Sequence, residues 1–268
     1  MTSALLKAEN LSKWFGERKI LDGVSFEVRE GETLVIMGGS GCGKSTLLRI
    51  LVGLLAPDEG SVHSLGREIT RCSEAERDEV RKRFGMLFQG SALFNSLTVG
   101  ENVALPLKEH TALAEDIIRI IVKVKLELVG LTGFETLRPH QISGGMKKRV
   151  GLARAIALDP KIVFCDEPGA GLDPITASVI DHLIMDLTKK LRMTSIVVTH
   201  EMKSAFRIAD RILVLHRGQV VATGTPSEIQ SSNHPYVNQF IRGEIDGPVH
   251  FQETRESYLQ GIFGEEPA

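Results

Sequence analysis

Residues 38–46 read Gly38-Gly39-Ser40-Gly41-Cys42-Gly43-Lys44-Ser45-Thr46, which matches the pattern G-x-x-x-x-G-K-[ST] of a phosphate-binding loop. The motif follows a short apolar run and precedes a segment of helical character, and this context disfavours a flexible glycine loop without a ligand. In such a loop backbone N–H groups surround the α- and β-phosphates, Lys44 neutralises the β- and γ-phosphates, and Ser45 offers its hydroxyl to Mg²⁺. We therefore expect all nine residues to contact a nucleoside triphosphate.

Four apolar runs predict a buried parallel sheet around this loop. They are rich in Val and Ile and are separated by helical stretches, as the strands of α/β proteins are. The runs are residues 34–37, 162–165, 195–198 and 212–215. Upstream, Val24, Phe26 and Val28 alternate with polar residues, which predicts a half-buried strand of an antiparallel layer. The predicted fold class is α/β, a P-loop NTPase core with an antiparallel β layer.

The spacing of apolar residues becomes helical from about residue 90 to 158, which predicts a helical subdomain inserted into the core. The residues that share one face of a predicted helix there are Ile117, Ile120, Ile121, Val124 and Leu128. After a strand expected at 219–223, Pro and Gly punctuate the tail too often for long regular elements. We therefore divide the chain into a domain of residues 1–230 and a C-terminal extension of residues 231–268.

The composition excludes several classes of protein. The 268 residues include 32 Lys and Arg against 34 Asp and Glu, so no positive field predicts a nucleic-acid partner. Three cysteines without a C-x-x-C spacing argue against a disulfide framework and favour a reducing compartment. No apolar run is long enough to span a membrane or to act as a signal peptide. We expect the chain to stay in the cytoplasm and to work at a membrane only through another protein's spanning helices.

Two adjacent carboxylates, Asp166 and Glu167, follow the apolar run at 162–165. Alone, such a pair would more often begin a solvated loop, but doubly wound sheets bind ligands at the carboxyl ends of their strands. Together with the phosphate-binding loop, the pair predicts that Asp166 holds Mg²⁺ through water and that Glu167 polarises the attacking water. Because neighbouring side chains of a strand point to opposite sides, alternation would let the two carboxylates divide these tasks.

A second anion site is predicted at Ser143-Gly144-Gly145, before a helix expected at 147–158. Ser143 is a candidate N-cap, and the two glycines leave amide groups free at the positive end of the helix. An ordinary capped helix is the alternative. One triphosphate can reach two distant sites of a small chain only if those sites meet, so we expect two copies to sandwich nucleotide head to tail.

These motifs, in this order and with His200 after the run at 195–198, resemble the nucleotide-binding subunits of ABC transporters over about residues 5–230. The resemblance implies the ABC ATPase fold, hydrolysis of ATP with Mg²⁺, and a homodimer. It also implies that Phe15 stacks on adenine, with Trp14 as a rival, and that Gln89 touches Mg²⁺ and the attacking water and meets the membrane subunit. His200 would contact the γ-phosphate and hold Glu167 and the water in register.

The resemblance further implies that Asp173 belongs to a loop that crosses the dimer interface and links the two sites. Some positions depart from the usual pattern of the family. Met146 and Ile142 replace a frequent Gln and Leu, but neither position supplies a phosphate contact. Gly169 and Gly171 stand where small or hydroxyl residues are usual, which is expected to loosen the loop before Asp173. ATP binding is not put in doubt by these differences.

Two further features have competing interpretations. Cys42 lies near a predicted helix N-terminus, which makes it a candidate low-pKa thiol, with a small filler residue as the alternative. The basic clusters at residues 77–83 and 147–149 are interpreted as solvated helix faces rather than lipid or nucleic-acid patches. We assign these clusters no binding role.

A narrower resemblance lies in residues 87–99, 101–111 and 243–249, which are similar to the ATPases of Mce-type phospholipid transporters, the MlaF-like group. This implies phospholipid transport between bacterial membranes, at the cytoplasmic face of the inner membrane. The partners implied are a separate MlaE-like integral-membrane permease, a small STAS-type accessory subunit and an Mce-type lipid-binding protein. The tail motif is expected to reach the other protomer. The alternatives are amino-acid import, lipoprotein release, or a soluble ABC ATPase without a transport role.

Overall fold

Alternating side chains build the first sheet. The computed structural model describes residues 4–248, and in it β2 buries Leu21, Val24 and Val28 while Phe26 is half-buried, as the alternation predicts. β2 pairs antiparallel with β1, and the sheet order is β2-β1-β4-β5. Its strands are β1 (Ala4–Phe15), β2 (Arg18–Arg29), β4 (Glu59–Ser64) and β5 (Arg67–Glu68).

The four continuous apolar runs form the second sheet, which is parallel apart from one edge strand. The sheet order is β10-β9-β3-β8-β7-β6, and only β10 runs antiparallel to its neighbour in this described sheet. The strands are β3 (Thr33–Met37), β6 (Phe84–Leu87), β7 (Ile162–Asp166), β8 (Thr194–Thr199), β9 (Arg211–His216) and β10 (Gln219–Gly224). The predicted α/β class with an antiparallel layer is confirmed.

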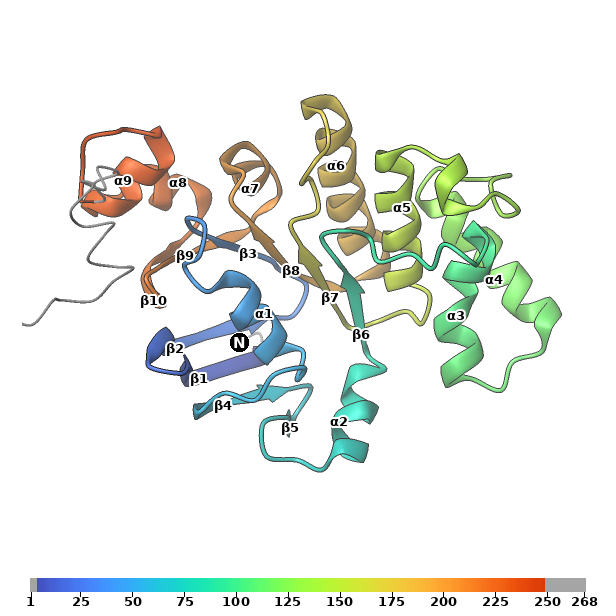
Figure 1. The fold of residues 1–268 in the computed structure, drawn as a ribbon, viewed down its shortest axis with the longest axis horizontal. Coiled ribbons are helices and arrows are strands. Elements are labelled where there is room, and N and C mark those ends of the chain that lie inside the picture. The colour runs from blue at the N-terminus through green and yellow to red at the C-terminus, as the bar shows by residue number, and fades with distance from the viewer. Residues whose placement is uncertain (1–3, 249–268) are drawn as a thin grey trace, which may run out of the picture.

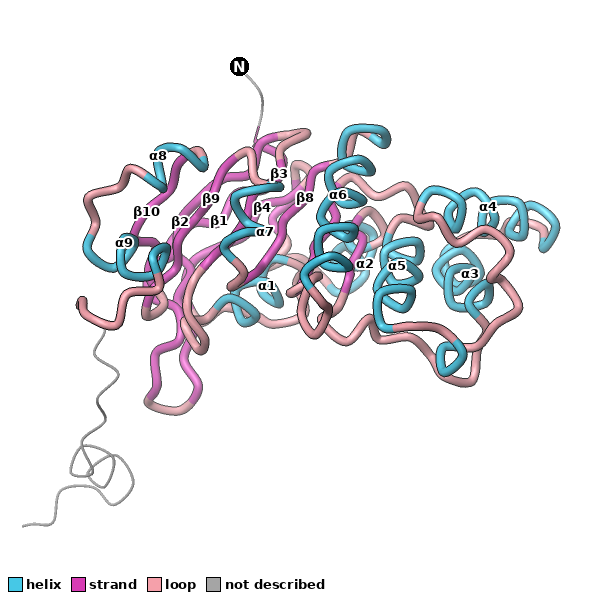
Figure 2. The backbone as a smooth tube through the Cα atoms, turned by 90° about the horizontal axis from the view of Figure 1, so that it is seen from above, coloured by secondary structure: helices cyan, strands magenta, loops and turns pink. Residues whose placement is uncertain are grey.

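Helices cover both faces of the second sheet (Figure 1). α1 (Lys44–Leu51) lies between the two sheets and buries Leu47, Leu48 and Leu51 there. α5 (Gly144–Ala155), α6 (Pro174–Leu191) and α7 (Met202–Ile208) cover the opposite face. α3 (Val99–His110), α4 (Glu115–Leu128) and the short η1 (Pro139–Gln141) complete the helical part at one end of the molecule (Figure 2).

The C-terminal elements lie at the opposite end of the molecule from α3 and α4 (Figure 2). They are α8 (Pro226–Gln230) and α9 (Pro235–Arg242). A separate helix, α2 (Glu74–Arg81), lies near the first sheet. Tyr236 and Val237 of α9 are buried in the same core cluster as Ile212 and Val214 of β9. Val249, the last residue of the tail motif, lies outside the described residues.

The predicted helix is present as α4, and the face that packs on the core lies beside the predicted apolar face. Ile117, Ile120 and Val124 are 46%, 59% and 48% exposed, whereas the neighbouring stripe faces the core. The core-facing residues are Ile118, Val122 and Leu126, with Ile121 and Leu128 half-buried beside them. Two apolar stripes adjoin each other on this helix, and periodicity does not distinguish the one that packs.

Within residues 4–248, no helix combines the length and the apolarity that crossing a bilayer requires.

β6 and α5 approach each other closely at Gly85. A Cβ at this position would lie 2.2 Å from the carbonyl oxygen of Ala155. We expect Gly85→Ala to lower the free energy of unfolding by about 1–3 kcal/mol, because backbone must move to admit the methyl group. Urea denaturation measures this change. Gly90→Ala is the control, since nothing lies within 4 Å of its added Cβ, and an equal loss in both variants would contradict the argument.

Candidate nucleotide site

The phosphate-binding loop connects the end of β3 to the start of α1. Gly41 and Gly43 have φ angles of 73° and 105°, a region that glycine occupies without the strain of a side chain. Gly43 is the N-cap of α1 and supplies no side-chain acceptor, so the first N–H groups of this helix face the loop without a side-chain cap. Lys44 is buried, and its Nζ donates to the carbonyl oxygens of Gly38 and Gly39 at 2.9 and 3.0 Å. The ammonium group therefore lies inside the curve of the loop.

Strand register brings the other predicted catalytic residues to this loop. Met37 pairs with Thr199 of β8, and Val198 pairs with Asp166 of β7. The segments that follow these three strands begin with the phosphate-binding loop, Glu167 and His200. Parallel strands that end in register bring their following loops together at one edge of the sheet.

Glu167 and His200 contact each other directly. Nδ1 of His200 lies 2.9 Å from Oε1 of Glu167, and the backbone N–H of His200 donates to Oε2 at 3.3 Å. Glu167 is 8% exposed, so these contacts fix a buried carboxylate. The His200 side chain is 57% exposed, so the imidazole lies between the buried carboxylate and solvent.

Asp166 ends β7, and its Oδ1 is buried without a hydrogen-bond partner in the described structure. Burial raises the pKa of Asp166, and the charge of Glu167 raises it further. We expected strand alternation to separate these two carboxylates. The strand ends at Asp166, so alternation does not extend to Glu167. Glu167 instead has a φ angle of 47°, in the left-handed region, so it begins the turn that follows the strand.

Lys148 corrects the interpretation of residues 147–149 as a solvated face. It is 5% exposed, and its Nζ donates to the backbone carbonyl oxygen of Gln89 and, at 3.2 Å, to that of Glu167. Burial lowers its pKa. The burial of Lys148 follows from its position on the helix. Residue 148 falls on the same helical face as Gly145, Gly151 and Leu152, which are all buried. β6 ends at Leu87, so Gln89 lies in the segment that follows this strand.

The serine-glycine motif begins α5 three residues earlier than predicted. The Ser143 hydroxyl accepts from the N–H of Met146 at 3.3 Å, so Ser143 is the N-cap. A Cβ at Gly145 would lie 2.4 Å from Cγ2 of Thr176, which means that α5 packs closely against the start of α6. Figure 1 shows α5 in the helical part and α1 between the sheets. Ser143 and Gly144 are exposed.

Asp173 is the N-cap of α6. Its Oδ1 accepts from the N–H groups of Ile175 and Thr176, each at 3.0 Å, and the Thr176 hydroxyl donates to Oδ2. These hydrogen bonds lower the pKa of Asp173, the one from the Thr176 hydroxyl most strongly. The start of α6, like the start of α5, lies on the exposed surface of the chain.

Phe15 and Trp14 lie at the hairpin between β1 and β2 and have different surroundings. Phe15 is 53% exposed. Trp14 is half-buried. Each ring has a lysine ammonium nearby, with Nζ of Lys19 4.7 Å from the ring centre of Trp14 and Nζ of Lys13 5.8 Å from that of Phe15, so exposure is what distinguishes them. The exposed ring of Phe15 is therefore the better candidate to stack on a planar ligand.

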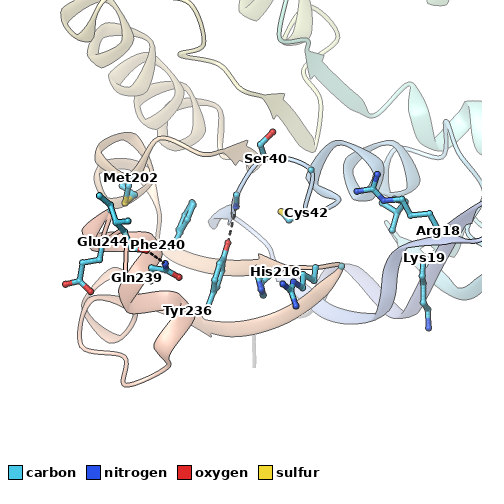
Figure 3. A pocket seen from close by; sticks show the side chains of 17 residues that line it. Arg18, Lys19, Ser40, Cys42, Met202, His216, Tyr236, Gln239, Phe240 and Glu244 are labelled. Atoms are coloured by element: carbon cyan, nitrogen blue, oxygen red, sulfur yellow. Dashed lines mark hydrogen bonds between the residues drawn. The ribbon is translucent and has the colours of Figure 1, made fainter. Parts of the chain in front are cut away.

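A cavity of about 800 Å³ lies between the phosphate-binding loop and the C-terminal extension (Figure 3). Tyr236 of α9 points at the loop, and its hydroxyl oxygen accepts from the N–H of Gly39 at 3.2 Å. The Tyr236 ring stacks on His216, with 3.6 Å between the ring centres. Sequence analysis did not connect the extension to the loop, because residues 39 and 236 are joined only by tertiary packing.

Cys42 is buried beside this cavity, and burial raises the pKa of its thiol although the Lys44 charge opposes the change. The low-pKa interpretation is therefore wrong, and Cys42 fits as a small filler residue. Its sulfur would be 2.8 Å from a Cβ at Gly38, which leaves no space for a larger side chain between them.

The family model described as ABC transporter matches residues 21–170, which is more than half of the chain. The chain belongs to the ABC transporter family. This ABC ATPase is 44% identical over 263 residues to the intermembrane phospholipid transport system ATP-binding protein MlaF of Haemophilus influenzae, covering 98% of this chain and all of that protein. It is 43% identical to the probable ribonucleotide transport ATP-binding protein mkl of Mycobacterium leprae, covering 94% of this chain and 72% of that one.

Solved structures agree with the fold of this ABC ATPase. A dimeric post-hydrolysis state of the ATP-binding cassette MJ0796 bound to ADP and Pi has a TM-score of 0.76 and 34% identity, covering 82% of this chain and 98% of that one. The cbiO1 subunit from Clostridium perfringens has a TM-score of 0.79 and 30% identity, covering 90% and 96%. The family resemblance that the motifs predicted is confirmed.

The contact between Tyr236 and Gly39 yields a prediction for this ABC ATPase. Tyr236→Phe removes one hydrogen bond of the phosphate-binding loop and keeps the ring, so we expect ATP affinity to fall about 2- to 10-fold. Titration with a fluorescent ATP analogue measures the change. Asn238→Ala, on the same helix but not among the residues that line the cavity, is the control. Unchanged affinity in Tyr236→Phe would contradict a role of the extension in shaping the loop.

Proposed function

We propose that the chain is the ATP-hydrolysing subunit of a phospholipid transporter, and that it works through a separate integral-membrane permease. The observation that carries the hydrolytic part is the contact between Glu167 and His200 beside the phosphate-binding loop. A carboxylate held by a histidine at this edge of the sheet can polarise a water molecule that attacks a phosphorus atom. The proposal assigns Glu167 as the base and His200 as the residue that orients it and contacts the γ-phosphate.

The nucleotide would be held mainly by the phosphate-binding loop and Phe15. Lys44 can exchange its two carbonyl partners for β- and γ-phosphate oxygens, which are stronger acceptors for an ammonium group. The N–H groups of Gly39 and Cys42 donate to protein oxygens, so the other N–H groups of the loop and the start of α1 would favour the negative charge of the phosphates. The exposed ring of Phe15 can stack on adenine.

The residues present fit a Mg²⁺ ion. The buried and unpartnered Oδ1 of Asp166 suits a divalent cation, either directly or through its water shell. Asp166, Ser45 and Gln89 would hold the ion. A bound ion would supply positive charge against the negative charge that develops during phosphoryl transfer.

A homodimer would complete each site. Ser143, Gly144 and Gly145 lie at the start of α5, away from the loop of their own chain, and Ser143 and Gly144 are exposed. Their amide groups can therefore bind the γ-phosphate held by a second copy, with Asp173 in the loop between the two sites. The dimeric structure of MJ0796 supports this arrangement.

Relatives of the chain support phospholipid as the cargo. MlaF of Haemophilus influenzae, named for phospholipid transport, is covered over its full length, whereas mkl, named for ribonucleotide transport, is covered over 72%. Phe88 and Phe94 are 39% and 53% exposed on either side of Gln89, and they offer apolar contact for a permease helix there.

The remaining assignments of the proposal concern location and partners. The chain would act at the cytoplasmic face of the bacterial inner membrane with an MlaE-like permease, a STAS-type subunit and an Mce-type protein. We assign residues 1–230 to the ATPase domain, with its helical subdomain at about 90–158, and residues 231–268 to an extension.

Purification of the tagged full-length chain from detergent-solubilised membranes tests the transport part. We expect mass spectrometry to detect a spanning subunit and bound phospholipid in the purified complex. Lys44→Ala, which impairs nucleotide binding alone, should retain both. A spanning subunit recovered without enriched phospholipid would contradict phospholipid as the cargo, and recovery of nucleic acid or ribosomes would overturn the transport proposal.

A further inference from the structure

Lys148 joins three segments that the reaction needs. It lies in the second turn of α5, and its Nζ donates to the carbonyl oxygens of Gln89, after β6, and Glu167, after β7. The lysine therefore links the helix that begins with Ser143 to the loop that faces the permease and to the main chain of the proposed base.

Stability alone does not explain a lysine here. Its side chain is 5% exposed, and within residues 4–248 the ammonium group forms no ion pair. The two carbonyl groups, together with the nearby charges of Asp166 and Glu167, compensate only part of the cost of removing the ammonium charge from water. An apolar side chain of similar length would fill the same space without that cost.

Close packing of α5 against β6 makes the two contacts possible. A Cβ at Gly151 would lie 2.9 Å from Cδ1 of Leu87, and one at Gly85 would lie 2.2 Å from the Ala155 carbonyl oxygen. Because α5 approaches β6 this closely, the Lys148 side chain reaches past the strand end to both loops.

Glu167 depends on such support. Its φ angle of 47° is unfavourable for a residue with a side chain, so surrounding contacts must maintain it. Its N–H donates to Val198 at 2.8 Å, and its carbonyl oxygen accepts from Ala170 at 3.1 Å as well as from Lys148. Lys148 is thus the side chain that ties this turn to another helix.

We propose that Lys148 is a positioning residue that makes the Gln89 loop and the Glu167 turn move as one unit with α5. The proposal rests on the proposed function, because it takes Glu167 as the base. A displacement of the Gln89 loop by a permease would then shift the Glu167 carboxylate, since both carbonyl groups share one donor.

Steady-state ATP hydrolysis by the purified full-length chain tests this. Lys148→Met keeps the length of the side chain and removes the donor, so we expect kcat to fall about 10- to 100-fold, as misplacement of a catalytic group does, while KM and ATP affinity stay within about 2-fold. Lys148→Arg restores a donor and should recover most of the rate. Lys147→Met, next to it on the same helix, is the matched control.

A double-variant cycle tests whether Lys148 acts through Glu167. Added to Glu167→Gln, Lys148→Met should cost little further rate, because the lysine acts through the placement of that carboxylate. Full activity of Lys148→Met, loss of ATP affinity along with rate, or additive effects in the cycle would each overturn the proposal. Failure of the proposed function is distinguishable, because it would appear as full activity of Glu167→Gln, whatever Lys148→Met does.

Discussion

Lys44→Ala is expected to lower the affinity for ATP by about 100-fold or more. The ammonium group lies inside the phosphate-binding loop, and its removal leaves phosphate charge without its buried cationic partner. Equilibrium binding of a fluorescent ATP analogue measures the loss. Lys82→Ala, at the C-cap of α2 and paired with Glu79, is the control and should bind as the unsubstituted chain does. An unchanged affinity in Lys44→Ala would mean that the loop does not hold the triphosphate.

Glu167→Gln is expected to lower kcat for ATP hydrolysis by about 100- to 1,000-fold while ATP affinity stays within about 3-fold. The amide has the size of the carboxylate and can still accept from the His200 N–H, but it is not a base. Phosphate release under saturating ATP gives the rate. Glu201→Gln changes an exposed glutamate next to His200 and should leave the rate nearly unchanged. Normal turnover by Glu167→Gln would assign the base to another group.

The fold was largely predictable because its main signals are local. Continuous apolar runs give buried strands, and the glycine-lysine motif between such a run and a helix defines the nucleotide loop. Strand ends in register then bring Asp166, Glu167 and His200 to that loop. Each of these steps depends on residues that are adjacent in sequence or on the general rule for parallel sheets.

The misses depend on packing between distant segments. α4 carries two adjoining apolar stripes, and only its neighbours decide that Val122 rather than Val124 is buried. Lys148 belongs to a basic triplet, and its burial follows from the close approach of α5 to β6. The contact between Tyr236 and Gly39 joins residues 197 positions apart, and no local pattern predicts it.

Assembly of the dimer tests the central claim most directly, namely that Ser143, Gly144 and Gly145 of one copy complete the nucleotide site of another. Sedimentation velocity of Glu167→Gln with Mg²⁺ and ATP, in which hydrolysis no longer separates the copies, measures the mass of the assembly. We predict a single species of twice the monomer mass. Without ATP, or in the double variant that also carries Ser143→Arg, we predict monomer. A monomer that nevertheless carries bound ATP would contradict the account.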